Sequence, residues 1–139
     1  MTPRNISIPQ EPEEAPRDVM IREADRLVRD ILWLAEEGRC YTCDGEATDV
    51  AHLFSRRHLR LRWDVEPNGN CHLLCRTCHD ADHAGNLAPS YSDTFIKKQG
   101  DAAFDELLIR KMEVSPVKDY EIEHKRGKLQ AKLEAMYAG

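Results

Sequence analysis

Four cysteines stand in two pairs whose spacing is typical of a zinc site. Each pair has the form Cys-x-x-Cys, and 31 residues separate the pairs, which consist of Cys40, Cys43, Cys75 and Cys78. A Cys-x-x-Cys segment turns two thiolates toward one point, and two such segments complete a tetrahedral set of sulfur ligands. The alternatives are reduced structural cysteines or a redox pair. We expect a structural Zn²⁺ that ties the front of this region to its back.

The fifth cysteine, Cys71, has no Cys-x-x-Cys partner. We expect a buried thiol there, with a ligand role as the alternative.

A second group of residues in the same stretch has the composition of a hydrolytic metal site. Phosphodiester hydrolysis needs a base that activates water and a divalent cation that stabilises charge on the phosphate. His52 is the candidate base, and Asn70 on a facing strand could orient it directly or through a backbone contact. His79 and His83 are four residues apart, so on a helix they share one face and could bind one ion.

The order of these residues resembles that of the HNH (ββα-metal) endonucleases. The stretch from Asn70 to His79 is similar to the family's central stretch, an asparagine, an apolar-rich strand and a Cys-x-x-Cys-His helix start. The resemblance implies a ββα-metal core with His52 as general base, Asn70 as orienting residue, and His79 and His83 as metal ligands. It implies Mg²⁺ or Mn²⁺ as the catalytic cation, with Zn²⁺ or Ni²⁺ possible.

Many HNH proteins carry an acidic residue or a histidine directly before the base, as a metal ligand. Here Ala51 occupies that position. Asp49 would project to the same side of the strand, so it is the candidate replacement ligand. Water and phosphate could instead complete the coordination.

Residues 51–64 also resemble a segment of the phage NinG/Rap recombination nucleases. The shared pattern is a small residue, His, an aromatic residue and Ser-Arg, followed by Arg-aromatic-Asp, and the similarity covers roughly residues 40–110. It implies an endonuclease that cuts branched DNA, Holliday junctions included, during phage recombination. A junction cutter makes two coordinated cuts, which predicts a homodimer.

A basic segment follows the candidate base directly. Residues 51–63 contain four arginines and no acidic residue, whereas the whole chain has a formal net charge of −5; the arginines are Arg56, Arg57, Arg60 and Arg62. A local basic stretch in an acidic protein fits an enzyme that contacts DNA phosphates at one place. The alternative is an ordinary solvated loop.

The pattern of the sequence predicts an α+β fold in which a small zinc-bound core, which positions these residues, is flanked by helices. We expect short strands over 47–54 and 71–74 and a helix over 76–84. The predicted organisation is an acidic disordered tail over 1–16, an N-terminal helix over 17–38, the zinc-bound HNH nuclease core over 39–90, and C-terminal helices over 91–139.

The flanking helices are expected to serve packing. We expect Ser92 to cap one helix and Ser115, before Pro116, to cap the last one. The apolar seam of that last helix could pack on the domain or on a second subunit. Because both terminal helices carry many carboxylates, we expect packing or homodimer contacts from them rather than DNA contacts.

The bulk composition agrees with one domain in a reducing compartment. The chain has 139 residues, 41% of them hydrophobic, and lacks any apolar run of the roughly 18 residues that span a membrane. It also lacks an apolar signal core near Met1. We therefore expect no membrane contact and a cytoplasmic location, in a bacterium or a phage-infected host cell.

Three functions compete at this point. The first is a metal-dependent DNA endonuclease acting on branched DNA. The second is another HNH enzyme, a nicking, restriction or packaging nuclease acting on duplex DNA. The third is a zinc-ribbon module that binds DNA or protein without catalysis, in which the histidines are structural.

Overall fold

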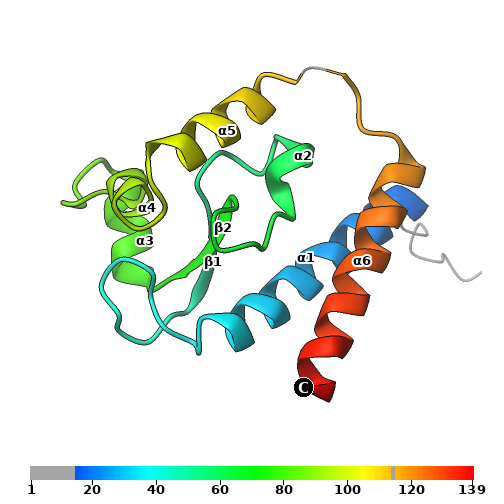
Figure 1. The fold of residues 1–139 in the computed structure, drawn as a ribbon, viewed down its shortest axis with the longest axis horizontal. Coiled ribbons are helices and arrows are strands. Elements are labelled where there is room, and N and C mark those ends of the chain that lie inside the picture. The colour runs from blue at the N-terminus through cyan, green and yellow to red at the C-terminus, as the bar shows by residue number, and fades with distance from the viewer. Residues whose placement is uncertain (1–14, 114) are drawn as a thin grey trace, which may run out of the picture.

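The computed structural model describes residues 15–113 and 115–139, so the predicted tail lies outside it except for its last two residues. The α+β class is confirmed: helices surround a two-stranded sheet (Figure 1). The elements are α1 (Pro16–Ala35), β1 (Asp49–His52), α2 (Leu59–Arg62), β2 (Cys71–Leu74), α3 (Arg76–His83), α4 (Tyr91–Gln99), α5 (Asp101–Lys111) and α6 (Asp119–Ala138).

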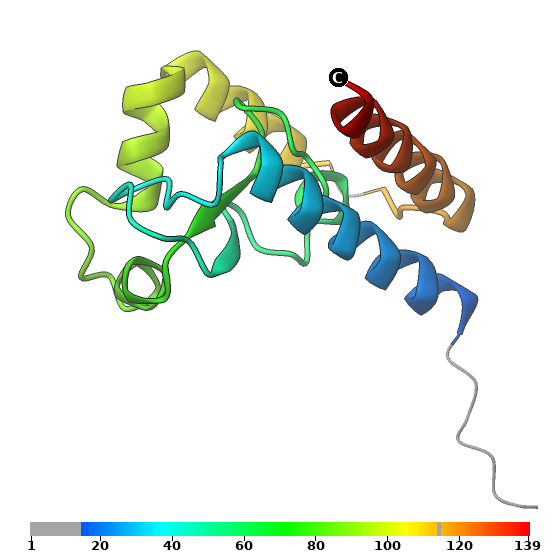
Figure 2. The ribbon, with the colours of Figure 1, turned by 90° about the horizontal axis from the view of Figure 1, so that it is seen from below.

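The two long helices, α1 and α6, lie side by side and cover one side of the hairpin (Figures 1 and 2). Pro16 stands at the start of α1, where its missing N–H costs no hydrogen bond. The apolar seam of α6 packs against α1 within the chain, which is the first of the two expected alternatives. The residues that meet are Ala24, Leu27, Val28, Ile31 and Leu32 of α1 and Ile122, Leu129 and Leu133 of α6.

Strand β2 lies between two apolar clusters. It pairs antiparallel with β1, and the register places His52 opposite Cys71 and Asp49 opposite Leu74. Cys71 and Leu73 belong to the cluster with α1 and α6, whereas Leu74 packs on the other side with residues of α3 and α4. All four residues of β2 are buried, because successive side chains of a strand point to opposite faces and both faces are covered.

Two helix starts differ from the prediction, because the expected capping serines do not cap these helices. Ser90, not Ser92, caps α4, since its hydroxyl accepts a hydrogen bond from the backbone N–H of Asp93 at 3.0 Å. Helix α6 begins at Asp119 instead of after Ser115. The hydroxyl of Ser115 is engaged elsewhere, because it accepts from Arg60 at 2.9 Å and donates to Glu113 at 2.7 Å.

Among the described residues, none of the helices is both long enough and apolar enough to cross a membrane.

Gly69, directly before Asn70, allows the chain to pass close to Asp64. A Cβ atom added at Gly69 would lie 2.5 Å from Oδ1 and 2.8 Å from the backbone oxygen of Asp64. We predict that Gly69→Ala lowers the free energy of unfolding by about 2 kcal/mol through this overpacking.

The matched control for this substitution is Gly127→Ala in α6. A Cβ there meets no atom within 4 Å, so we expect a gain of about 0.5 kcal/mol from helix propensity. Urea denaturation of the two variants measures both effects, and equal stability of the two would contradict the prediction.

Candidate metal centre and catalytic groove

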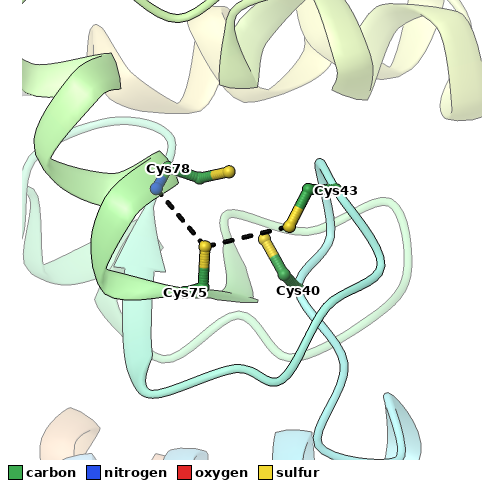
Figure 3. Close-up of side chains that lie close together, drawn as sticks. All are labelled: Cys40, Cys43, Cys75 and Cys78. Carbon is green, nitrogen blue, oxygen red and sulfur yellow. Dashed lines mark hydrogen bonds between the residues drawn. The ribbon is translucent and has the colours of Figure 1, made fainter.

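The four paired cysteines come together as expected from their spacing. Their sulfur atoms all lie within 4.8 Å of one another, and Figure 3 shows them converging from two segments. Cys40 and Cys43 lie in the turn after α1, whereas Cys75 caps α3 and Cys78 lies in its first turn. Sulfur atoms bound to one zinc ion at about 2.3 Å stand roughly 3.8 Å apart. The Cys43 and Cys75 sulfurs are 3.8 Å apart, so the group is compatible with structural zinc.

Backbone N–H groups are directed at these sulfurs. The N–H of Gly45 donates to Cys43 at 3.4 Å and that of Cys78 to Cys75 at 3.3 Å. Burial raises the pKa of Cys40, but hydrogen bonds from Thr42 and from backbone N–H groups outweigh it and lower that pKa to about 6. These contacts favour the thiolate form of Cys40. For Cys78, a hydrogen bond from Thr42 lowers the pKa, but burial and the neighbouring cysteines outweigh it and raise that pKa to about 12.

Cys71 lies outside this group, as expected of a buried thiol. It is 0% exposed, and its S–H donates to the backbone oxygen of Arg62 at 3.1 Å. Among the residues that the structure describes, the four paired cysteines form the one group of three or more His, Cys, Asp or Glu side chains with converging ligand atoms.

A separate groove of about 670 Å³ runs beside β1, between α1 and α3. It collects most of the side chains that the sequence singled out for chemistry, together with others that it did not. The charged residues and histidines that line it are Asp25, Arg29, Asp49, His52, Arg56, Arg76, His79, Asp80 and His83.

His52 is held in one tautomer in this groove. Its Nε2 lies 3.0 Å from the backbone oxygen of Arg62, which can only accept, so Nε2 carries the hydrogen. Burial lowers the pKa of His52 to about 4, although the contact with Arg62 opposes this effect. The ring is therefore neutral near pH 7 and keeps the lone pair of Nδ1 for accepting a proton.

Asn70 acts on the loop after His52 and not on the imidazole itself. Its side chain is fully buried; it accepts from the N–H of Phe54 at 2.8 Å and donates to the Phe54 oxygen at 2.9 Å. Of the two routes expected for an orienting asparagine, the structure has the backbone contact.

Asp49, the candidate replacement ligand, contacts two side chains of α3. Its carboxylate accepts two hydrogen bonds from Arg76, each 2.9 Å, and lies 2.9 Å from Nδ1 of His79. The guanidinium of Arg76 and the contact with His79 lower the pKa of Asp49 to about 2 despite its partial burial. Because the carboxylate is ionised, Nδ1 of His79 carries the hydrogen and donates it to Asp49. Asp49 therefore orients the imidazole ring of His79.

The remaining nitrogen of His79 faces His83 one helical turn later. The two Nε2 atoms are 3.2 Å apart. This is a hydrogen-bond distance, and it is also compatible with two ligands of one tetrahedral zinc ion, whose nitrogens at about 2.0–2.1 Å from the metal stand roughly 3.3 Å apart. The contact of Nδ1 with a carboxylate is the support that metal-binding histidines usually have.

Two of the four arginines predicted to contact DNA are engaged inside the protein. Arg62 binds the carboxylate of Asp25 in α1 through two hydrogen bonds of 2.9 and 2.6 Å. Arg60 contacts Ser115 at 2.9 Å and Glu121 at 3.5 Å. Arg56 and Arg57 are exposed, and Arg56 lines the groove.

The sequence reasoning missed Asp25, Arg29 and Arg76 as groove residues. Arg76 carried a signal, since it lies within the second Cys-x-x-Cys pair, three residues before His79. Asp25 and Arg29 carried none, because the fold alone brings α1 to the groove.

Comparison of the chain with models of known protein families, with curated proteins and with solved structures finds no match.

The cysteine group predicts the metal content of the protein and its variants. We expect about one tightly held zinc ion per chain, lost in Cys75→Ser together with much of the stability, because structural zinc contributes directly to folding. Cys71→Ala is the matched control and should keep its zinc. Zinc analysis after gel filtration measures both variants, and equal zinc loss in the two would rule out the assignment.

Proposed function

We propose that this protein is a metal-dependent DNA endonuclease whose working site is the groove beside β1. The observation that carries the proposal is the meeting of His52 with the His79–His83 pair in that one groove. His52 is neutral near pH 7 and so can accept a proton, although burial lowers its pKa to about 4 and makes it a weaker base than a free imidazole; two imidazole nitrogens 3.2 Å apart could bind a shared cation. The resemblance of the strand–strand–helix order to HNH nucleases supports the same interpretation.

In the proposed reaction, Nδ1 of His52 accepts a proton from the attacking water. The carbonyl of Arg62 keeps the ring in the tautomer that leaves this nitrogen unprotonated. Asn70 holds the backbone of Phe54, two residues after His52, and so keeps the wall of the groove in place. Arg56, exposed at the groove, would contact the phosphate.

His79 and His83 would hold the cation, and a bound cation would stabilise negative charge on the phosphate and the leaving oxygen. Imidazole nitrogens suit Zn²⁺ or Ni²⁺, whereas Mg²⁺ and Mn²⁺ prefer oxygen ligands. With Asp49 engaged by Arg76 and His79, the donor set favours the first two ions over the Mg²⁺ or Mn²⁺ of the initial expectation.

Branched DNA is the proposed substrate class, and this part rests on the resemblance to phage recombination nucleases. Coordinated cutting of a junction would require a dimer. The apolar faces of α1 and α6 pack against each other, so such a dimer would use other surfaces.

A non-catalytic zinc-bound nucleic-acid module is the second candidate. It is favoured by the cysteine group alone, which needs no role for the groove. It gives no reason for the ordered contacts from Asp49 through His79 to His83.

His52→Ala tests the catalytic assignment, with His124→Ala on the exposed side of α6 as its matched control. We expect the first variant to lose at least about a hundredfold in cleavage rate, the usual contribution of a general base, while it keeps its affinity for DNA. The control should cut like the unmodified protein.

Cleavage of a four-way junction is compared with that of linear duplex of the same sequence, each with Zn²⁺, Ni²⁺, Mn²⁺ or Mg²⁺. Full cutting by His52→Ala would remove the base assignment. Equal rates on junction and duplex would remove the branched-DNA proposal.

A further inference from the structure

The face of α1 opposite its buried side carries three arginines in a line. Arg22, Arg26 and Arg29 are all exposed, and Trp33, 38% exposed, continues the line. At 100° per residue these four positions fall within an arc of about 60°, directly opposite the apolar stripe of the helix. We call Arg22, Arg26 and Arg29 the arginine stripe.

The arginine stripe is continuous with the groove that holds His52. Arg29 lines that groove from α1, and Arg56 and Arg76 line it from other elements. Asp25, the acidic residue of α1 in the groove, is paired with Arg62 at 2.6 Å, so its charge is largely compensated within the protein. The guanidinium of Arg29 lies 5.5 Å from the centre of the Trp33 ring, a contact that restrains its position.

We propose that the arginine stripe binds the phosphates of duplex DNA that flank the bond cut in the groove. The inference deepens the proposed function and rests on it for the placement of the cut. Guanidinium groups match phosphate oxygens in geometry as well as in charge. From Arg22 to Arg29 the helix rises about 10 Å, which is long enough for the stripe to reach about two or three successive phosphates of one strand.

The chemistry of this face favours DNA over a lipid surface. Helices that bind membranes insert a broad apolar face, and the apolar side of α1 is buried against α6. Trp33 is the one large apolar side chain in line with the arginines. Total charge conceals the stripe, because carboxylates of α1 flank it: Asp18 and Asp25 lie on one side of the arginine arc, and Glu23 and Asp30 lie on the other.

The test uses the double variant R26A/R29A in the full chain, with K97A/K128A as a matched control. The control removes the same charge from exposed positions on α4 and α6, away from the groove. Binding to a linear duplex is measured over a range of salt concentrations without added divalent ion, so that no cutting occurs.

We expect R26A/R29A to bind at least about tenfold more weakly at low salt, with a slope of log K against log salt that is shallower by about 1.8. R26K/R29K should keep the slope, because lysine preserves the charge. K97A/K128A should keep both the slope and the affinity. If R26A/R29A binds duplex as the control does, the proposal is overturned; the same follows if its loss appears on phosphatidylserine-containing vesicles and not on duplex.

Failure of this inference and failure of the proposed function give different results. A protein that cuts DNA but whose R26A/R29A variant binds like the control has no phosphate-binding stripe. A protein that shows the stripe-dependent slope but cuts no DNA with any ion binds duplex through α1 without being a nuclease.

Discussion

The convergence of four sulfur atoms between the turn after α1 and the first turn of α3 sets the geometry of the candidate site. Cys75 caps α3 and Cys78 lies in its first turn, so an ion held there fixes where this helix starts and how it is directed. His79 follows at once and His83 one turn later. A metal ion bound by the four cysteines would supply a large part of the local folding energy, because only 6% of the residues are aromatic.

Two of the three carboxylates that line the groove are paired within the protein. Asp49 is bound by Arg76 and His79, and Asp25 by Arg62 and the indole of Trp63 at 2.8 Å. Both carboxylates thus position other groups. Asp49 orients the ring of His79, and Asp25 holds Arg62, whose backbone carbonyl contacts His52. A phosphate entering the groove would meet arginines and the neutral imidazole of His52, and Asp80 is the remaining carboxylate of the lining.

Features encoded by local spacing could be predicted from the sequence. The two Cys-x-x-Cys turns and the histidines four residues apart need only the geometry of a turn and a helix, and the hairpin follows from two short apolar runs. Contacts between distant segments could not be predicted. Asp25 meets Arg62 across 37 positions, and no periodicity in either segment indicates that meeting. The start of α6 was missed because Ser115, a good cap on its own, is used by Arg60 instead. The arginine stripe could not be predicted from composition, because the four carboxylates of α1 that flank it balance its charge.

We propose that the groove, and not the cysteine group, performs the chemistry. Cleavage of duplex, flap, single-stranded and four-way-junction DNA is measured with the zinc-loaded protein, before and after addition of a second divalent ion. We expect cutting that depends on the second ion and disappears in H79A/H83A while the zinc bound by the cysteines remains. Absence of cutting on every DNA form with every ion, or undiminished cutting by H79A/H83A, would contradict it.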